Sequence, residues 1–412
     1  MQYDSTYFDT VIDRRGTYCA KYDSMYQFFG SNQKLIDSLI PMWIADTEFR
    51  CPQELVEAVV TRAQHGAFGY GMLSGEKFRT YVQAWHERRN GIIYREEDIF
   101  MRRSTLVSLK CAVAGLSKIG DDVCLFTPTY GHFHQIVDAL QRNVIAVHLK
   151  RENGRYTIDY DALERALSEH DVKLLIFCNP FNPAGRVWRH EELVRLIDIC
   201  KRHAVPILSD EIHSDVIMPG NEFVPMLGVA RELEYESKVI MCSSTSKTFN
   251  TAGMSIGYYI APGGELKAAM HRAEKMMHET DPVTAFSYIT IRECYEHGDN
   301  YVDALCPYVW RNFQRLQRAL ANQPWSPSIE ITPLEGTYLA WIKLNDCNLD
   351  NWGATLHFVK HGIALEAGDQ FYETEGTFIR LNLAAPASVI DEALTRLVRG
   401  LDDLYTTQTQ NA

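Results

Sequence analysis

The stretch KVIMCSSTSKTFNTAG (238–253) places a single lysine directly after a run of apolar residues. The run itself, KVIMCSS (238–244), is short and mostly apolar, which is typical of a strand buried on both faces of a sheet. The segment that follows consists of small hydroxylated residues around Lys247 and closes on Gly253. We therefore expect a buried strand whose carboxyl end presents one flexible cation.

Further runs of the same kind occur before and after this stretch and predict the rest of a sheet. They lie at 122–128, 144–149, 172–180, 205–210 and 256–262. Helical patterns separate several of them, and the clearest is HEELVRLIDICKRHA (190–204), whose apolar stripe consists of Leu193, Leu196, Ile197 and Cys200. This alternation predicts an α/β fold with a mostly parallel sheet covered by helices on both faces.

The pattern changes after about residue 290. A long helical stretch at 301–323 is followed by predicted strands at 336–344 and 377–384 and by a last helix at 389–401. We interpret this part as a smaller α+β domain. The predicted division is a large domain of residues 50–290 and a small domain that combines residues 1–49 with residues 291–412.

Composition favours small-molecule chemistry. The chain has 412 residues and a formal net charge of −12, which argues against a nucleic acid or an anionic membrane as the main partner. No run approaches the ~20 apolar residues of a membrane span, and the first residues lack a signal-peptide pattern. The ten cysteines include no C-x-x-C pair, so neither a disulfide nor a zinc framework is expected. We expect a cytoplasmic protein that binds small ligands.

Polar side chains follow four of the predicted strands. Ligands of an open parallel sheet bind beyond the carboxyl ends of its strands, so these positions are candidates for a site. They are Tyr130, the pair Asn179 and Asn182, the segment SDEIHSD (209–215) with Asp210, Glu211, His213 and Asp215, and Lys247. Taken singly, each has a structural explanation as a turn former, a helix cap or a solvated charge. A divalent-metal site in the acidic segment, joined by HFH (132–134), is a further alternative.

A lysine, an aspartate and an asparagine at successive strand ends together suit one cofactor, pyridoxal 5'-phosphate. A lysine amine forms a Schiff base with it, and a carboxylate against the pyridine nitrogen keeps the ring protonated as an electron sink. An amide donor bonds the ring oxygen, and an aromatic side chain such as Tyr130 covers the ring face. The combination of Lys247, Asp210 and Asn182 therefore favours this cofactor over the separate structural explanations.

At these residues the sequence resembles the fold-type I pyridoxal-phosphate enzymes of the class I/II aminotransferase superfamily. Asn182 precedes Asp210 by 28 residues (210 − 182) and Asp210 precedes Lys247 by 37 (247 − 210), in agreement with the order in that superfamily. Within it, the chain is similar to the cystathionine β-lyase, or C–S lyase, branch of the MalY/PatB type. The motifs that carry this resemblance are PMWIADTEF (41–49), GAFGYGMLSGE (66–76), NPFNPAGRVW (179–188), SDEIHSDV (209–216), SSTSKTFNTAG (243–253), LEGTYLAWI (334–342) and FIRLNLAAP (378–386).

The resemblance implies a role for each residue around the cofactor ring. Lys247 would carry the cofactor covalently, and Asp210 would pair with the pyridine nitrogen. Asn182 would bond the ring oxygen, and Tyr130 would stack on the ring. His213 stands where true aminotransferases commonly have a tyrosine at the ring oxygen. The catalytic residues implied in this way are Lys247, Asp210 and Tyr130.

The resemblance also implies a phosphate site at the start of a helix. Backbone amides around Ser104, Thr105 and Leu106 would hold the phosphate, because a helix N-terminus favours an anion. The hydroxyl group of Ser244 or Ser246 would add to them.

Two departures from the family pattern concern this phosphate site. The helix begins RRSTLVSL instead of a Gly-Val-Val-like start, so Arg102 or Arg103 is an alternative contact. Ser255 stands where many relatives carry a basic residue or glutamine.

Tyr70 matches a tyrosine that reaches the phosphate of the neighbouring subunit, which implies a homodimer with shared active sites.

Three residues are implied on the substrate side. Arg380 matches the arginine that takes the substrate α-carboxylate, a task that suits its forked donors. Asn182 and Trp43, together with the residues around Ala45–Asp46, would line the same side. No metal is implied.

The activity implied is cleavage of L-cystathionine or related cysteine S-conjugates to a thiol, pyruvate and ammonia. Lys247 would take the Cα proton, and a thiolate would leave from Cβ. Two alternatives stay open from the residues alone. One is an aminotransferase of the same superfamily, which reprotonates at the imine carbon instead of expelling a leaving group. The other is a regulatory binding protein on the same fold.

Overall fold

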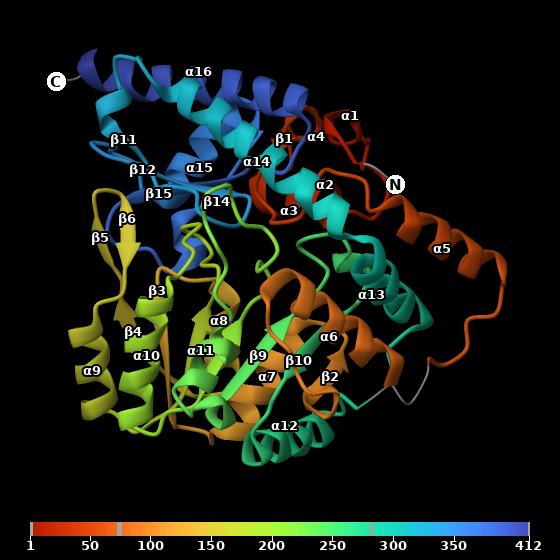
Figure 1. Cartoon of the computed structure of the whole chain (residues 1–412). Coiled ribbons are helices and arrows are strands. Elements are labelled where there is room, and N and C mark those ends of the chain that lie inside the picture. The colour runs from red at the N-terminus through yellow and green to blue at the C-terminus, as the bar shows by residue number, and fades with distance from the viewer. Residues whose placement is uncertain (1–2, 72–75, 281–282, 411–412) are drawn as a thin grey trace.

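The computed structural model describes residues 3–71, 76–280 and 283–410 (Figure 1). Within these residues the strands form one seven-stranded sheet, one four-stranded sheet and two pairs. The strands of the largest sheet are, in spatial order, β2 (Ile99–Arg102), β10 (Gly257–Ile260), β9 (Val239–Ser243), β8 (Ile207–Asp210), β7 (Val172–Cys178), β3 (Asp122–Thr127) and β4 (Asn143–His148).

The prediction of a mostly parallel sheet is confirmed. Strands β9, β8, β7, β3 and β4 pair in parallel, and β10 runs antiparallel to both of its neighbours, β2 and β9. All six apolar runs in the sequence become strands of this sheet. Only β2 was not predicted. Its residues alternate between buried and half-buried positions, so it lacks the continuous apolar run that marks the others.

Helices cover both faces of this sheet, as Figure 1 shows. In α10 the predicted stripe of Leu193, Leu196, Ile197 and Cys200 is fully buried, and each such aliphatic side chain stabilises the fold by about 1.5–3 kcal/mol. The helices of this part are α5 (Gln53–Gln64), α6 (Glu76–Asn90), α7 (Thr105–Leu116), α8 (Gly131–Ala139), α9 (Tyr160–Glu169), α10 (His190–Arg202), α11 (Met226–Glu232), α12 (Gly264–Met276) and α13 (Ala285–His297).

A second sheet is built from the C-terminal part of the chain. It is antiparallel, in the order β11 (Ile329–Ile331), β12 (Leu339–Leu344), β15 (Thr377–Asn382) and β14 (Glu366–Ala367). Figure 1 shows it beside the long helices of the C-terminal part. These helices are α14 (Asp299–Leu320), α15 (Asn351–Lys360) and α16 (Ala387–Gln410). The predicted strands and helices after residue 300 are therefore confirmed.

The N-terminal segment packs against this C-terminal part. Strand β1 (Ile40–Pro41) pairs in parallel with β13 (Ile363–Ala364). The short helices that precede β1 are α1 (Ser5–Phe8), α2 (Ala20–Asp23), α3 (Met25–Phe29) and α4 (Gln33–Ser38). A hairpin of β5 (Lys150–Glu152) and β6 (Arg155–Thr157) completes the strands.

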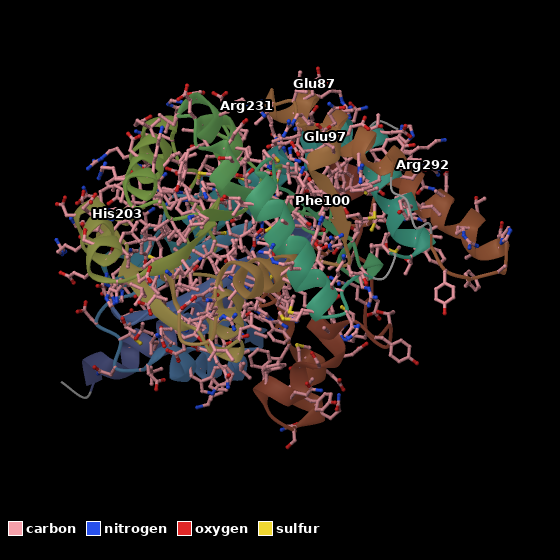
Figure 2. All side chains as sticks on the ribbon, turned by 90° about the horizontal axis from the view of Figure 1, so that it is seen from below. Glu87, Glu97, Phe100, His203, Arg231 and Arg292 are labelled. Carbon is pink, nitrogen blue, oxygen red and sulfur yellow. The ribbon has the colours of Figure 1, made fainter. Side chains whose placement is uncertain are left out.

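Charged side chains occupy the outward faces of the helices. Figure 2 shows Glu87, Arg231 and Arg292 at the outer edge of the molecule in that view, on α6, α11 and α13. Arg231 is paired there with Glu236 at 2.8 Å. Among the described helices, none is both long and apolar enough to cross a membrane.

The register of the central strands places the candidate residues at one edge. Cys178, Asp210 and Cys242 are opposite one another on β7, β8 and β9. These parallel strands therefore end at the same level, and the loops that follow them meet there. The side chains of Asn182, His213 and Lys247 come from those loops.

Candidate active site

A cavity of about 150 Å³ lies at the carboxyl edge of β7, β8 and β9. It brings together every residue predicted to contact the cofactor except Tyr70. These residues are Ser104, Thr105, Leu106, Tyr130, Asn182, Asp210, His213, Ser244, Ser246 and Lys247. They come from positions up to 143 residues apart in the chain (247 − 104), so the tertiary fold alone assembles them.

Lys247 is partly buried at this cavity, directly beyond β9. Its Nζ donates a hydrogen bond to the Ala45 carbonyl at 2.7 Å. Burial lowers the pKa of Lys247 to about 8; Asp46 acts in the opposite direction, and Arg380 lowers the pKa further. A lysine of this kind is partly neutral near neutral pH, so its amine can act as a nucleophile or as a base.

Asp210 ends β8 and is also buried. Its Oδ1 accepts a hydrogen bond from the Ile212 amide at 3.2 Å, and among the described residues it forms no ion pair. Burial raises the pKa of Asp210 to about 7, while the Ile212 bond and Lys247 lower it. A buried carboxylate with so little protein compensation fits a bound cation or N–H group of a ligand.

His213 and Tyr130 form further walls of the cavity. The ring of His213 is buried, its Nδ1 has no hydrogen-bond partner among the described residues, and burial lowers its pKa well below the ordinary value. Tyr130 precedes the first turn of α8, and burial raises its pKa to about 12. It stacks on His132 with the ring centroids 4.8 Å apart. Both rings are therefore uncharged at neutral pH.

The start of α7 forms an anion site at one end of the cavity. Ser104 caps the helix, and its side chain accepts a hydrogen bond from the Val107 amide at 3.3 Å. The amides of Thr105 and Leu106 belong to the first turn of the helix, where backbone N–H groups have no intrahelical partner. Gly257 lets β10 approach this turn, because a Cβ there would lie 2.7 Å from the Thr105 nitrogen.

The two candidate hydroxyl groups differ in availability. Ser244 Oγ donates to the Ile256 carbonyl at 2.6 Å and accepts from the Ser246 amide at 3.1 Å. The Ser246 hydroxyl has no hydrogen-bond partner in the part of the chain that the structure describes. Ser246 is therefore the better hydroxyl donor to an anion.

Of the two arginines before α7, Arg103 lines the cavity, whereas Arg102 pairs with Glu274.

Arg380 lies next to the cavity, on β15. Its Nη1 donates to Asn182 Oδ1 at 3.1 Å and its Nη2 to the Trp43 carbonyl at 2.8 Å. Nε has no partner among the described residues, although the side chain is only 3% exposed. Glu366 Oε2 lies 3.5 Å from Nη2. An almost fully buried guanidinium with an unpaired donor fits a ligand carboxylate.

Besides Arg380, two other predicted site residues, Trp43 and Tyr70, do not line the cavity. The indole of Trp43 packs instead with Met25 and Phe29, and its Nε1 donates to the Lys21 carbonyl at 2.9 Å. The prediction that the Trp43 side chain contacts substrate is therefore not supported, because the sequence does not reveal which way the ring points. Only its carbonyl reaches Arg380.

Tyr70 lies apart from the cavity within the single chain. Its side chain is 100% exposed, and it borders a separate hollow with Phe68 and Phe286. Residues 72–75 of the motif GAFGYGMLSGE (66–76) lie outside the described residues.

The alternative of a metal site in the acidic segment is not supported. Glu211 Oε1 accepts hydrogen bonds from Ser209 Oγ and the Met226 amide. Asp215 accepts from Trp85 Nε1 and Thr248 Oγ1. Both carboxylates thus hold neighbouring elements together and are not directed at a shared centre with Asp210 and His213. The histidines at 132 and 134 stack on tyrosine rings, those of residues 130 and 372.

Other contributors were not predicted. Gly257 and Ile256 shape the phosphate end, and Glu366 lies beside Arg380 as its cross-strand partner. The signal for Gly257 is a glycine in an otherwise apolar strand, which commonly marks a close backbone approach. No local sequence pattern indicates Glu366, since its contact with Arg380 depends on the pairing of β14 with β15.

Asn179, predicted beside Asn182, donates to the Val224 carbonyl and does not line the cavity.

Taken together, these residues fit pyridoxal phosphate. The cavity holds one amine, one buried carboxylate without an ion pair and a helix N-terminus that can bind an anion, and its lining residue Asn182 contacts Arg380, which has an unpaired donor. Each of these groups matches a different part of the cofactor or of an amino acid.

Known proteins are similar to this chain over almost its whole length. A family model described as aminotransferase class I and II matches residues 44–397. Cystathionine beta-lyase PatB of Bacillus subtilis is 30% identical, covering 96% of this chain and 99% of its own. Protein MalY of Escherichia coli is 26% identical, covering 96% and 98%.

Solved structures agree. Cystalysin from Treponema denticola, which contains a pyridoxal 5'-phosphate cofactor, superimposes with a TM-score of 0.91 at 30% identity, covering 98% of this chain and 100% of its own. The PLP-bound C–S lyase from Staphylococcus hominis gives a TM-score of 0.85 at 27% identity, covering 96% and 97%. From the match of the family model and the extent of these similarities, the chain belongs to the aminotransferase class I and II family.

Proposed function

We propose that this protein is a pyridoxal-phosphate-dependent C–S β-lyase that cleaves L-cystathionine or related cysteine S-conjugates to a thiol, pyruvate and ammonia. The observation that carries the proposal is one cavity that holds Lys247, Asp210 and the start of α7. The C–S lyase and cystathionine beta-lyase names of similar proteins support the reaction class.

Each part of the cofactor has a residue to hold it. The amides of Thr105 and Leu106 and the Ser246 hydroxyl would bind the phosphate, and Lys247 would carry the aldehyde carbon. Asp210 would face the pyridine nitrogen, where a positive charge would lower the raised pKa of this carboxyl group. When bound, the cofactor supplies an electron sink that stabilises negative charge at the substrate α-carbon.

The remaining groups hold the other parts of the cofactor and the substrate. Asn182 would bond the cofactor ring oxygen through its amide nitrogen, since its Oδ1 already accepts from Arg380. Tyr130 and His213 would bound the ring. Arg380 would bind the substrate α-carboxylate through its unpaired Nε. The Asn182 and Trp43 contacts hold its guanidinium in place in advance, which lowers the ordering cost of binding.

Lys247 is the proton-transfer group of this arrangement. With a pKa of about 8, its amine can hold the α-proton at neutral pH and release it again. His213 is kept neutral by burial, so it adds no positive charge beside the amine. The electron pair left at Cα then forms a Cα=Cβ double bond while the C–S bond breaks with its own pair on sulfur, so that the thiolate departs from Cβ. Hydrolysis of the remaining three-carbon enamine by one water molecule gives pyruvate and ammonia.

An aminotransferase is the alternative within the same family, since the family model itself carries that description. A regulatory binding protein is the second alternative. Against the latter, the cavity retains the amine, the carboxylate and the arginine that chemistry needs, and a binding protein has no use for a lysine of lowered pKa.

The test is a product assay with the cofactor-loaded full chain and L-cystathionine. A β-lyase releases pyruvate and thiol in equal amounts without a keto-acid co-substrate, and Lys247→Ala releases neither. Consumption of the amino acid only in the presence of added keto acid would favour the aminotransferase. No turnover of any cysteine S-conjugate by the loaded protein would contradict the enzyme proposal.

We also propose a homodimer in which Tyr70 reaches the partner's cavity. A fully exposed tyrosine beside Phe68, which is 62% exposed, supports this, because such apolar exposure commonly marks an interface. Sedimentation of the full chain and of Tyr70→Phe, together with cofactor titration, tests it. The proposal requires a dimer in both and weaker cofactor binding in the variant.

Two further properties are proposals of the same kind. We place the domain boundary at Gly298, between α13 and α14, because residue 290 falls inside α13; the small domain would then join residues 1–49 to 299–412.

We propose a cytoplasmic location. Its support is that all ten cysteines are free, as a reducing compartment would keep them.

A further inference from the structure

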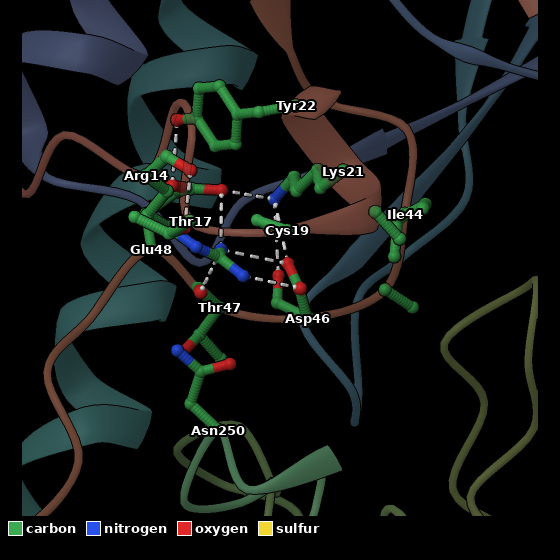
Figure 3. Close-up of polar contacts among 12 residues, drawn as sticks. Arg14, Thr17, Cys19, Lys21, Tyr22, Ile44, Asp46, Thr47, Glu48 and Asn250 are labelled. Atoms are coloured by element: carbon green, nitrogen blue, oxygen red, sulfur yellow. Dashed lines mark hydrogen bonds and ion pairs between the residues drawn. The ribbon is translucent and has the colours of Figure 1, made fainter. Parts of the chain in front are cut away.

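Four charged side chains, two of them buried and two partly buried, form a cluster beside the turn that binds Lys247 (Figure 3). This N-terminal charge cluster consists of Arg14, Lys21, Asp46 and Glu48. Lys21 Nζ lies 2.6 Å from Glu48 Oε1 and 3.4 Å from Asp46 Oδ1. Arg14 Nη2 lies 2.7 Å from Asp46 Oδ2, and its Nη1 lies 3.2 Å from Glu48 Oε1. Two cations and two carboxylates leave the cluster without net charge.

The burial of this cluster is unusual for charged residues. The Lys21 side chain is fully buried and that of Glu48 is 6% exposed. Taking such charges out of water has a desolvation cost that their attraction often fails to exceed. A contribution to stability is therefore a weak explanation for the cluster, and a role in fixing the local chain path or the local field is a better one.

The cluster fixes the centre of the backbone segment formed by residues 43–49. Arg14 donates to the Thr47 carbonyl at 2.9 Å and Lys21 to the Asp46 carbonyl at 3.2 Å. Both cations thus hold the main chain as well as the carboxylates. On the far side of the same segment, Asn250 donates to the Phe49 carbonyl at 2.9 Å. Figure 3 shows these side chains converging on the segment, with Lys21 from α2, Arg14 from the loop between α1 and α2, and Asn250 from the loop after β9.

The same segment presents its carbonyl groups to the active site. The Ala45 carbonyl accepts from Lys247 Nζ at 2.7 Å and from the Tyr338 hydroxyl at 3.0 Å. The Trp43 carbonyl accepts from Arg380 Nη2 at 2.8 Å. Any shift of the segment would therefore move the acceptors of Lys247 and Arg380 together.

Charge links the cluster to Lys247 as well. After burial, Asp46 has the largest influence on the pKa of Lys247, and it raises that pKa. The influence is mutual, because Lys247 is among the groups that lower the pKa of Asp46. The charged or titratable groups that face Lys247 are Asp46 and Lys21 from the N-terminal part, Asp210 at the end of β8, His213 in the loop after it, His132 on α8 and Arg380 on β15.

We propose that Asp46, held by Arg14 and Lys21, is a positioning residue that sets the orientation and the proton affinity of the Lys247 amine. Asp46 itself does not line the cavity. It acts through the Ala45 carbonyl, one residue away, and through its charge. Asp46, 201 residues earlier in the chain, thereby tunes the reacting amine (247 − 46). The inference rests on the proposed function only in taking Lys247 as that amine.

The test measures the ionisation of Lys247 directly in the full chain freed of cofactor. Limiting acetic anhydride is applied over a range of pH, and acetylation of Lys247 is quantified by peptide mass spectrometry. Asp46→Asn raises the net charge of the cluster from 0 to +1, so the midpoint for Lys247 should fall by roughly one pH unit. The double variant Lys21→Met/Glu48→Gln disturbs the cluster but keeps its net charge at 0. Lys21 is itself among the groups that lower the pKa of Lys247, so the midpoint of the double variant should not fall.

Comparing the two variants distinguishes an effect of the Asp46 charge on Lys247 from a general loosening of the N-terminal charge cluster. An unchanged midpoint in folded Asp46→Asn, or an equal shift in the double variant, would overturn the proposal. If Asp46→Asn fails to fold, Glu48→Gln makes the same charge change farther from Lys247, and a smaller downward shift is expected; no shift would again overturn it. The labelling needs neither cofactor nor substrate. A failure of the lyase assay would therefore leave these midpoints unaffected, and the two failures are distinguishable.

Discussion

Replacing Gly257 by alanine should weaken cofactor binding through backbone overlap alone. A Cβ at this position would lie 2.6 Å from the Ser104 carbonyl carbon, 2.7 Å from the Thr105 nitrogen and 2.9 Å from the Ser104 Cα. All three are main-chain atoms, so no side-chain rotation relieves the overlap. The start of α7 or the strand β10 must move.

The size of the effect follows from the cost of overpacking. Adding a methyl group to a tightly packed site typically costs about 1–3 kcal/mol. If the first turn of α7 moves away from the cavity, the amides of Thr105 and Leu106 lose their position at the phosphate. Cofactor binding is then weakened by this same cost of about 1–3 kcal/mol, so the dissociation constant of the cofactor should rise about 5- to 140-fold.

The assay is a titration of the cofactor-free full chain with pyridoxal phosphate, followed by visible absorption. Gly264→Ala is the matched control, because a Cβ at Gly264 would meet nothing within 4 Å. Thermal melting of both variants without cofactor reports the strain on the fold itself. If Gly257→Ala binds the cofactor as tightly as Gly264→Ala, the start of α7 is not the phosphate site.

Four other substitutions test separate parts of the site. Arg380→Lys should lower kcat/KM by about 10- to 150-fold with cofactor binding unchanged, because a lysine cannot keep the forked contacts; equal kcat/KM would contradict carboxylate binding there. Asp210 has a pKa of about 7, above its ordinary 3.8, so the cofactor-free fold should lose stability as pH rises from about 4 to about 7. Asp210→Asn should flatten that pH dependence of the melting temperature and lower turnover about 100-fold or more. Ser246→Ala should raise the cofactor dissociation constant about 10-fold, whereas Ser244→Ala should mainly lower the melting temperature; the reverse pattern would exchange their roles.

The strands that carry the site were predictable because of how they are buried. Strands β7, β8 and β9 are covered on both faces, so their sequences are continuous apolar runs that end abruptly in polar residues. Strand ends in a parallel sheet share one edge, which is why Asn182, Asp210 and Lys247 could be placed together from their order alone. The resemblance to known enzymes then added Arg380, which lies on a different sheet.

Side-chain direction was the part that sequence could not supply. Trp43 sits in the right segment, but its indole turns into a separate small core while its carbonyl faces Arg380. Ser244 and Ser246 are two residues apart, and only the structure shows that the first hydroxyl is occupied by the Ile256 carbonyl. The pairing of Arg14 with Asp46 spans 32 residues without any periodic pattern, so no local signal could reveal it.

The proposed enzymatic function depends on whether Lys247 carries the cofactor. The decisive measurement is reduction of the cofactor-loaded full chain with borohydride, which makes a lysine-linked cofactor permanent, followed by peptide mass mapping. We predict one modified lysine per chain, Lys247, in the peptide that contains SSTSKTFNTAG (243–253). An unmodified Lys247, or a cofactor attached to another lysine, would contradict the assignment of this cavity as the active site.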